Sequence, residues 1–341
     1  MDRKLTYRES GVDIKAADSI KKRIGELVKG TFTNSTISEF GLFGGIYQLP
    51  SGKGRTVIAS TDGVGTKLFV AQRMKRFDTV GVDIVNHCIN DIIVHGAEPL
   101  FFLDYLGIHS PEEFVVDIVK GLCSACKKAG IPLIGGETAV MPEMYSEGKF
   151  DLVGTIVGIL REKDIITGKS IKPGDIIIGL PSSGLHTNGY TLARKALFEK
   201  GKMKIDDTLP SLEKSIGEEL LTPHTSYLKP VQKAKQRCKI HGMAHITGGG
   251  IKGNLVRILP EGTSAVIYRK NWRVPTIFNI IQKTGGIDTE EMYNVFNMGI
   301  GYLFIVPPQE FDKLKLSIAS AGLKGIVIGK IISGERDVDF E

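Results

Sequence analysis

Residues 56–67 read Thr-Val-Ile-Ala-Ser-Thr-Asp-Gly-Val-Gly-Thr-Lys, and this stretch decides the fold. Its first residues are mostly β-branched and predict a strand, and the two glycines predict a turn at the strand's exit. Asp62, Thr66 and Lys67 follow within that exit. A nucleoside triphosphate is bound by such groups. Its negative charge is neutralised by a divalent cation and a lysine, and glycine allows backbone N–H groups to come close to it. The spacing matches neither familiar phosphate loop, and such a run is also typical of a plain turn.

Two further acids lie at the ends of apolar segments. Asp91 closes the run 81–89, and Glu137 lies in a Gly-Gly-Glu-Thr sequence that follows the apolar residues 131–134. Carboxylates that gather repel one another unless a cation neutralises them, and magnesium prefers such hard oxygen ligands. We therefore predict that Asp62, Asp91 and Glu137 meet around Mg²⁺ that is bound with ATP. The alternative is three unrelated, solvated acids at loop ends.

Strand-like and helical runs alternate along the first half of the chain, so we predict an α+β fold of two mixed α/β domains. A polar connection with turn-forming residues at 161–174 marks the boundary. The predicted domains are 1–165 and 170–341. Within the first, strands are expected at 56–60, 100–105, 131–134 and 152–160, and helices near 78–95 and 111–129.

The second half contains two loops with the composition of ligand sites. A buried strand at 176–180 runs into small and hydroxyl residues at 181–190, and a helix follows from about Thr191. An anion binds well at such a helix N-terminus, but a structural cap uses the same residue types, and both interpretations stay open. A glycine-rich loop from His245 to Gly250 also precedes a helix. His245 alone is more typical of a structural histidine than of a catalyst.

Composition restricts the class of protein. The chain has 341 residues, of which 42% are hydrophobic and 24% charged, as in an ordinary globular protein of about two domains. Its net charge of +6 is spread in short groups and does not require a nucleic-acid partner. No apolar stretch reaches the roughly 18 residues of a membrane span, and residues 1–10 lack the apolar core of a signal peptide. We expect a cytoplasmic protein with no membrane partner.

The four cysteines do not suggest a disulfide framework or a zinc site. Cys123 and Cys126 have a zinc-like spacing, but no second Cys or His pair stands at ligand distance in the sequence. Ile118, Leu122 and Cys126 share one face of the predicted helix 111–129, so we predict that Cys123 and Cys126 lie in the core.

Eight motifs, in order along the chain, resemble those of the phosphoribosylformylglycinamidine cyclo-ligase family, also called aminoimidazole ribonucleotide synthetases. The resemblance extends from Tyr7 to about Val306. The motifs are Tyr7-x-x-Ser10-Gly11-Val12-Asp13, Phe43-Gly44-Gly45, the segment 61–67, Asn90-Asp91, the segment 96–105, Gly135-Gly136-Glu137-Thr138, the segment 182–190 and His245-Ile246-Thr247-Gly248-Gly249-Gly250.

This resemblance implies an enzyme of purine biosynthesis. The family converts formylglycinamidine ribonucleotide and ATP to aminoimidazole ribonucleotide, ADP and phosphate. ATP phosphorylates the formyl amide oxygen, and an amidine nitrogen of the same molecule then closes the five-membered ring. The resemblance also implies a homodimer, in which the N-terminal sheets of two subunits pair into a barrel-like core and each C-terminal α/β domain packs alongside.

The resemblance also implies roles for single residues. Asp62, Asp91 and Glu137 become magnesium ligands, and Asn90 orients a metal-bound water. His186 is the candidate for proton transfer or a simple phosphate donor, and Lys67 shares the catalytic role at the phosphates. The remaining nucleotide contacts are Gly63, Gly65 and Thr66, and the substrate contacts are Ser182, Ser183, Gly184, His186, Asn188, His245, Gly248 and Gly249.

Three alternatives stay open. Thiamine phosphate kinase and selenide water dikinase share the acid-rich glycine loops, but they usually have an acid where this chain has His245, and no reactive cysteine precedes Cys88. A second alternative is a non-catalytic nucleotide-binding regulator, although every expected acid is present. The third is a nucleic-acid-binding module, which rests only on the basic balance.

Overall fold

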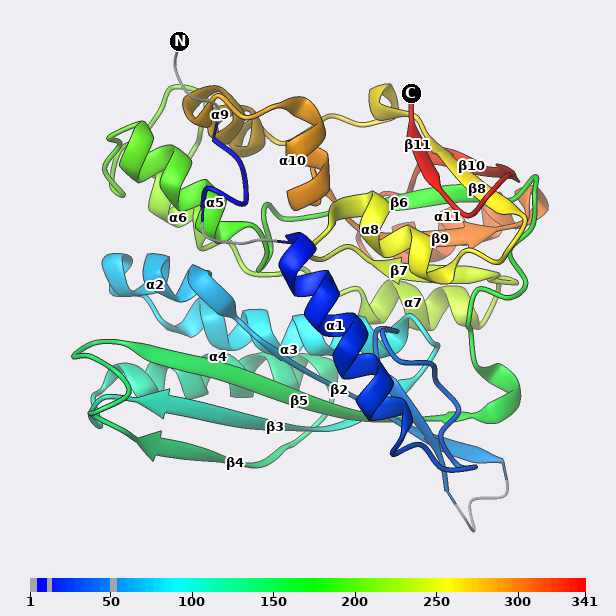
Figure 1. The fold of residues 1–341 in the computed structure, drawn as a ribbon, viewed down its shortest axis with the longest axis horizontal. Helices are drawn as coiled ribbons and strands as arrows, with labels where there is room; N and C mark the ends of the chain where they lie inside the picture. Colours follow the sequence, from blue (N-terminus) through cyan, green and yellow to red (C-terminus); the bar gives the residue numbers. More distant parts are fainter. Residues whose placement is uncertain (1–4, 11–13, 50–53) are drawn as a thin grey trace.

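The computed structural model describes residues 5–10, 14–49 and 54–341, which form two mixed α/β halves, each built on one sheet (Figure 1). Gly11–Asp13, the end of the first family motif, lie outside the described residues. The strands of the first sheet, in spatial order, are β1 (Gly45–Gln48), β2 (Arg55–Gly63), β5 (Phe150–Arg161), β3 (Glu98–Ile108) and β4 (Leu133–Val140).

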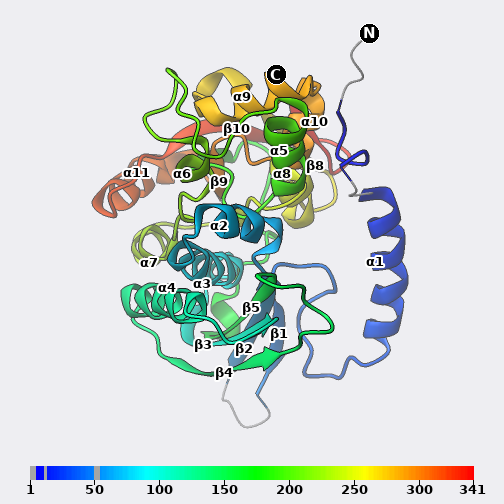
Figure 2. The ribbon, with the colours of Figure 1, turned by 90° about the vertical axis from the view of Figure 1, so that its left-hand side faces the viewer.

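The first sheet forms a half-barrel whose two faces differ. Its neighbouring strands are antiparallel except for β3 and β4. Helices α3 (Asp78–Ile93) and α4 (Phe114–Ala129) cover one face (Figures 1 and 2). Along β5, buried residues alternate with half-buried ones, as expected when only one face packs on the core. The other face, here called the open face, carries the half-buried apolar side chains of Val57, Leu103, Tyr105, Val153, Val157 and Ile159.

Helices α3 and α4 pack with their backbones in contact. A Cβ atom added at Gly81 of α3 would lie 2.2 Å from the Ile118 carbonyl oxygen. A Cβ atom added at Gly121 of α4 would lie 1.9 Å from the Asp78 carbonyl oxygen. Neither position has room for a side chain, so these two glycines set the spacing of the helices. On its other side, α3 packs on the sheet, where a Cβ at Gly154 would lie 2.8 Å from Ile84 Cγ1.

The second half is built on a six-stranded sheet in which only β8 and β11 run parallel. Its strands, in spatial order, are β11 (Val338–Phe340), β8 (Thr263–Ile267), β10 (Ile326–Ser333), β6 (Ile176–Pro181), β9 (Ile300–Val306) and β7 (Gly242–His245). Its α-helices are α5 (Tyr190–Arg194), α6 (Ile216–Leu220), α7 (Leu228–Lys235), α8 (Gly250–Leu255), α9 (Thr276–Gly285), α10 (Thr289–Val295) and α11 (Phe311–Ser320), and a π-helix, Lys195–Lys200, continues α5.

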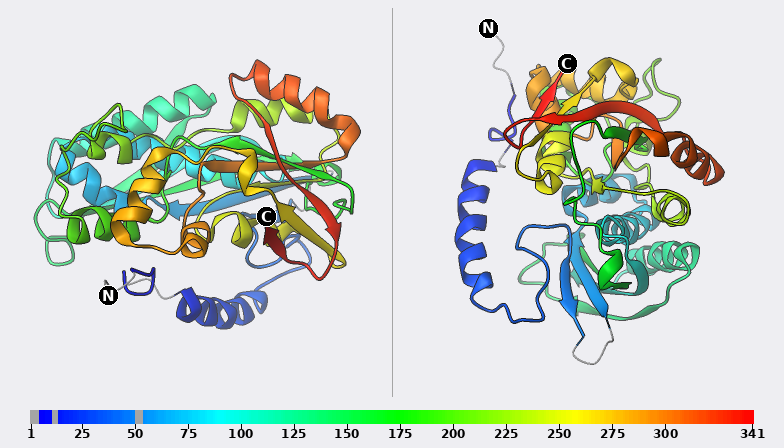
Figure 3. Two further views of the ribbon diagram at one scale, coloured as in Figure 1. Left: turned by 90° about the horizontal axis from the view of Figure 1, so that it is seen from above. Right: turned by 90° about the vertical axis from the view of Figure 1, so that its right-hand side faces the viewer.

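The two sheets are joined by residues 162–175. The predicted division at 165–170 falls in this connection, and the independence of the two domains stays a prediction. Helix α1 (Ile14–Lys29) lies along the outside of the molecule (Figures 2 and 3). The segment before it contacts the second half, because Tyr7 N–H donates to Glu291 Oε1 at 2.7 Å.

Most elements predicted for the first half are confirmed. The expected strands correspond to β2, β3, β4 and β5, and the helix expected at 78–95 is α3. Helix α4 begins at Phe114, three residues later than predicted, and ends at Gly130 in the left-handed conformation. The prediction that both cysteines of α4 lie in the core is wrong for Cys123, which is exposed, whereas Cys126 is buried. Among the described residues, the structure has no helix both long and apolar enough to cross a membrane.

Candidate active site

A polar stripe runs along α3 where the two halves meet. Asp83, His87 and Asp91 lie four residues apart, so the helical repeat places them on one face, and all three are buried. Ile84 and Cys88, on the neighbouring face, are also buried and turn toward the sheet. The helix thus presents its apolar residues to the first sheet and its ionisable residues to the second half.

The backbone of residues 222–227 is bound to this stripe. Asp83 Oδ1 accepts a hydrogen bond from His224 N–H at 2.7 Å. Asn90 Nδ2 donates to the Thr225 carbonyl at 2.8 Å, and its Oδ1 accepts from the backbone of the same segment. Asn90 was expected to orient a metal-bound water. In the structure it is fully buried, and its amide is bonded to the segment 222–227.

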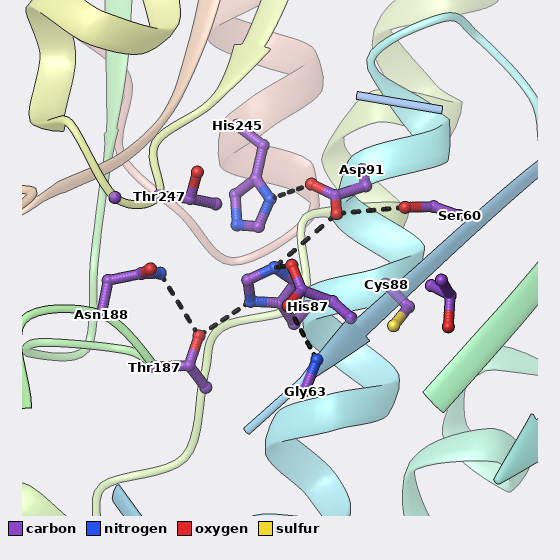
Figure 4. A network of polar contacts seen from close by, with 12 residues as sticks. Ser60, Gly63, His87, Cys88, Asp91, Thr187, Asn188, His245 and Thr247 are labelled. Carbon is purple, nitrogen blue, oxygen red and sulfur yellow. Dashed lines mark hydrogen bonds and ion pairs between the residues drawn. The ribbon is translucent and has the colours of Figure 1, made fainter. Parts of the chain in front are cut away.

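Asp62 and Asp91 both face His87. Figure 4 shows Asp91 and His87 with the neighbouring polar residues of both halves. Asp62, at the end of β2, places Oδ2 at 2.8 Å from His87 Nε2, and Asp91 Oδ2 lies at 3.6 Å from the same nitrogen. Asp62 Oδ1 accepts the Gly63 N–H at 2.7 Å. The Asp62 side chain is 46% exposed and that of Asp91 is 8% exposed. One carboxylate is therefore open to a ligand and the other is nearly enclosed.

His87 supplies the positive charge of this cluster. Burial alone would lower the pKa of His87, but the adjacent Asp62 and Asp91 carboxylates outweigh burial and raise it to about 9. Burial would raise the pKa of Asp62, but the His87 charge and hydrogen bond lower it overall. At neutral pH His87 is thus an imidazolium, and Asp62 beside it is an ionised carboxylate.

A chain of polar contacts extends from this cluster into the second half. His245 Nδ1 lies 2.7 Å from Asp91 Oδ1, and its Nε2 lies 3.0 Å from His224 Nε2. Thr187 Oγ1 lies 2.8 Å from His87 Nδ1 and 3.4 Å from His224 Nδ1. Burial is the main reason why the pKa values of His224 and His245 are lowered, so both rings are neutral. His245 accordingly donates from Nδ1 to Asp91 and accepts at Nε2.

Lys67 does not face an open site, although it was expected beside the nucleotide phosphates. Its ammonium group is fully buried and lies 2.8 Å from Asp83 Oδ2. It also donates to the carbonyl oxygens of His186 at 3.1 Å and Thr222 at 2.9 Å. All three N–H groups are therefore used within the protein. In this structure Lys67 joins α3 to two loops of the second half.

The loop Ser182–Asn188 is held by hydrogen bonds within it and to the segment 222–227. Ser182 Oγ donates to the Gly184 carbonyl at 2.9 Å, and Ser183 Oγ donates to the backbone of the segment 222–227 at 2.6 Å. His186 has a left-handed backbone, and its Nε2 accepts the Ser183 N–H at 3.2 Å. Its pKa lies well below the usual value, mainly because of burial. The proton of the neutral ring is thus on Nδ1, which has no hydrogen-bond partner among the described residues.

The remaining predicted contacts lie around this loop. A Cβ added at Gly248 would lie 3.3 Å from Asn188 Oδ1, so the two glycine-containing loops face each other. Gly249 follows in the left-handed conformation at the start of α8. Thr66 Oγ1 lies 3.0 Å from Thr191 Oγ1, which joins the stretch after β2 to α5.

Glu137 lies apart from Asp62 and Asp91. It is exposed on the edge strand β4. Strand pairing aligns Glu137 with Tyr105, Val153 and Gly63 across the sheet, so it lies level with the residue that follows Asp62. β5 and β3 separate β4 from β2, so three strand spacings, roughly 14 Å, separate the two backbones. Alternation along the strands turns Glu137 toward the open face, whereas Asp62 points toward α3.

Two groups of side chains in the described part of the chain present ligand atoms within 4.8 Å of one another. These are His87, Asp91 and His245, and His186, His224 and His245. Magnesium takes oxygen ligands, so the donors that suit it here are the carboxylates of Asp62 and Asp91. A separate cavity of about 900 Å³, lined in part by Ala97 and Lys235, shares no residue with either group.

Sequence reasoning missed His224, His87 and Asp83. Asp83 and His87 share the four-residue spacing that ends at Asp91, and this helical repeat was sufficient to find them. His224 lies in a segment without glycines or a strand exit. Its place is set by the bonds from α3 to its backbone, which no local pattern indicates.

Both halves match family models. Residues 44–160 match the N-terminal domain of AIR synthase related proteins, and residues 172–340 match the C-terminal domain of the same group. Among solved structures, a chain of the HypE–HypF complex has a TM-score of 0.66 at 21% identity, with 93% of this chain and 95% of that chain covered. The hydrogenase maturation protein HypE in complex with ATP has a TM-score of 0.62 at 17% identity, with 84% and 81% covered. These likenesses show the fold.

Curated relatives match over almost the whole length. The phosphoribosylformylglycinamidine cyclo-ligase of Thermodesulfovibrio yellowstonii is 46% identical, with 98% of each chain covered. That of Pseudothermotoga lettingae is 48% identical, with 98% of this chain and 99% of the relative covered. The chain thus belongs to the phosphoribosylformylglycinamidine cyclo-ligase family.

Proposed function

We propose that this protein closes the imidazole ring of purine biosynthesis, converting formylglycinamidine ribonucleotide and ATP to aminoimidazole ribonucleotide, ADP and phosphate. The observation that carries the proposal is the identity of 46–48% over the full length to enzymes of that name. The convergence of Asp62 and Asp91 beside the loops 182–188 and 245–250 supports it.

The reaction replaces one bond at the formyl carbon by another. The amide oxygen takes the γ-phosphoryl group of ATP, an amidine nitrogen attacks the formyl carbon, and the carbon–oxygen bond breaks as phosphate leaves. The nitrogen loses a proton as the ring forms. Because attacking and leaving groups belong to one molecule, holding it in a folded conformation supplies much of the acceleration.

The nucleotide site proposed here is built on the exit of β2. Magnesium, when bound, neutralises phosphate charge, and Asp62 and Asp91 would hold it. Asp62 is half exposed and anionic at neutral pH, since its pKa is lowered, as a ligand for a hard cation requires. Gly63, Gly65 and Thr66 would contact the phosphates through the turn that follows.

The substrate site proposed here lies between Asn188 and the glycines 248 and 249. Absence of a side chain at Gly248 leaves Asn188 uncovered. His186, with its proton on Nδ1, acts as a donor rather than as a base, and it also positions the loop through Ser183. His245 holds Asp91 in place. Ser182 and Gly184 then shape the loop by an internal hydrogen bond, and Ser183 ties it to the segment 222–227.

We also propose a homodimer that forms through the open face. Six half-buried apolar side chains lie on that face, and covering them with a second copy removes them from water. Glu137 turns toward this face and lies too far from Asp62 to share a magnesium ion in one chain. We propose that it acts in the site of the partner copy. A cytoplasmic location and the absence of a nucleic-acid partner belong to the same proposal.

The test is an assay of the purified protein with formylglycinamidine ribonucleotide, ATP and Mg²⁺. We expect aminoimidazole ribonucleotide and ADP in equal amounts, and no product when ATP is omitted. ADP without the aminoimidazole product, together with a phosphorylated thiamine phosphate or selenide, would assign the chain to a sister kinase. ATP binding without any turnover would support the non-catalytic regulator instead.

A further inference from the structure

Three cations gather around two aromatic rings beside the proposed nucleotide site. Arg194 Cζ lies 4.4 Å and Lys149 Nζ 4.5 Å from the centre of the Phe69 ring. Arg73 Cζ lies 5.2 Å from the centre of the Phe198 ring. We call Arg73, Lys149 and Arg194, with Phe69, the Phe69 patch. Its members come from α2 (Leu68–Met74), from the residue before β5 and from the end of α5.

The charge of the Phe69 patch is only partly offset by an acid, because Glu199 acts on Arg194 without forming an ion pair with it. In the described part of the chain, no carboxylate lies within ion-pair distance of Arg73, Lys149 or Arg194, although other surface cations such as Lys120 and Lys252 have one. Lys149 donates instead to the neutral amide of Gln72 at 3.1 Å. An aromatic ring attracts a cation without cancelling its charge. The rings therefore hold three like charges close together.

Holding these charges has an energetic consequence. Burial, and then the nearby Arg73 charge, lower the pKa of Arg194, and the Glu199 charge opposes them without cancelling them. An anion bound at the patch would relieve this repulsion and replace the water that Arg194 has lost. The arrangement therefore favours the binding of an anion.

The patch lies one helical turn from the proposed substrate loop. Arg194 follows Thr191 by three residues on α5, so the two share a face, and Thr191 contacts Thr66. The loop 182–188 contains no Lys or Arg, and its serine hydroxyls donate within the protein. Lys67 is fully buried. Of the loop 182–188, Lys67 and the Phe69 patch, only the patch therefore has cationic side chains that can reach a ligand.

We propose that the Phe69 patch binds the phosphate monoester of the ribonucleotide substrate, an inference that rests on the proposed function. A monoester carries about −1.5 to −2 charges at neutral pH and has no metal of its own, so it requires direct cations. ATP differs, because Asp62 and Asp91 would meet its phosphates through a divalent ion. The patch contains cations and no acid, which suits the first kind of phosphate.

The test compares two Michaelis constants. Arg194→Gln and Lys149→Gln each remove one charge, and Arg237→Gln, at an exposed arginine of the α7 end outside the patch, is the matched control. We expect the KM for formylglycinamidine ribonucleotide to rise about tenfold or more in the first two variants, as for a lost charge-assisted hydrogen bond, with the KM for ATP unchanged. A rise in the KM for ATP instead, or no change in either constant, would overturn the proposal.

A binding measurement without turnover separates this proposal from the proposed function. Ribose 5-phosphate, titrated calorimetrically into the wild-type protein and the control, should bind more tightly than ribose and lose affinity in Arg194→Gln. Circular dichroism checks that each variant is folded. Equal binding by wild type and Arg194→Gln would reject the patch even if ring closure is observed. Loss of binding in the variant would support it even if the reaction proves to be a different one.

Discussion

His87 carries its positive charge between two carboxylates that are themselves the proposed magnesium ligands. The imidazolium therefore supplies in the protein alone the neutralisation that a metal ion would supply in the complex. The His87 charge lowers the pKa of Asp62, so this carboxylate stays ionised and lies near Asp91 before any ligand binds. This pre-organisation lowers the electrostatic cost of assembling a site from two acids.

The pKa of His87 makes stability depend on pH. Its folded pKa of about 9 exceeds the ordinary value of 6.5, so its stabilising effect is complete below pH 6.5 and is lost as pH rises through 9. For the metal-free protein we predict that the free energy of unfolding falls by roughly 3 kcal/mol over that range. Urea unfolding at several pH values measures it. His87→Gln should abolish this fall, and an identical pH profile in the variant would contradict the assignment.

The Asp62→Asn variant tests the proposed magnesium site. Asp62→Asn keeps the size of the side chain and removes the charge, and we predict a loss of magnesium-dependent turnover of at least about 100-fold. Because the Asp62 charge also raises the pKa of His87, Asp62→Asn should lose part of the stability that His87 supplies at neutral pH, and circular dichroism checks that the variant is folded. Asp117→Asn, on the exposed side of α4, is the control. Wild-type turnover in Asp62→Asn would remove this residue from the site.

Residues of the site differ in how far sequence alone predicts them. Asp62 and Asp91 were found because each closes an apolar element, and the structure brings both to His87. The role of Lys67 was not predictable, because a lysine after a glycine turn looks the same whether it faces a phosphate or Asp83. Its environment is decided by which loops of the second half cover it.

At the scale of elements, α3 organises the site. One of its faces packs on the first sheet, and its polar stripe binds the segment 222–227 of the second half. Lys67 adds a link from the stretch after β2 to the same segment and to the loop 182–188. The relative position of the two proposed substrate sites thus depends on a small number of buried polar bonds.

Breaking the Lys67–Asp83 pair should destabilise the protein. In Lys67→Met, Asp83 is left as a buried, unpaired carboxylate, and we predict a loss of about 3–5 kcal/mol in unfolding free energy. The double variant Lys67→Met with Asp83→Leu should recover much of this loss, because it buries no charge. Denaturant unfolding of both variants measures the difference. A single variant as stable as the wild type would show that the pair is not structural.

At the scale of the whole molecule, the open face is the surface through which we propose that two copies pair. We predict that Val157→Lys, which places a charge in the middle of this face, converts a dimer to a monomer. Light scattering after size-exclusion chromatography gives the mass directly. Lys330→Glu, which changes the charge of an exposed residue in the second sheet, should leave the mass unchanged. A wild-type protein that is monomeric at all concentrations would contradict the dimer.

The first sheet could be predicted from the sequence to a greater extent than the second. Alternation along β5 and the apolar runs at β2 and β3 were enough for the first sheet. The spatial order of the second sheet, in which β6 lies between β9 and β10, follows from long-range pairing, and no local pattern contains it. The opposite directions of Asp62 and Glu137 follow from strand register, which sequence motifs do not specify.

The glycine contact between α3 and α4 transmits distant changes to the chemistry. A methyl group at Gly121 would clash with the backbone of Asp78, so α4 and α3, the helix that carries Asp91, would have to move apart. Such a substitution lies on α4, on the side of α3 away from the proposed site, and contacts no substrate. It would nevertheless lower enzyme activity, because Asp91 lies on the same helix as Asp78 and moves with it.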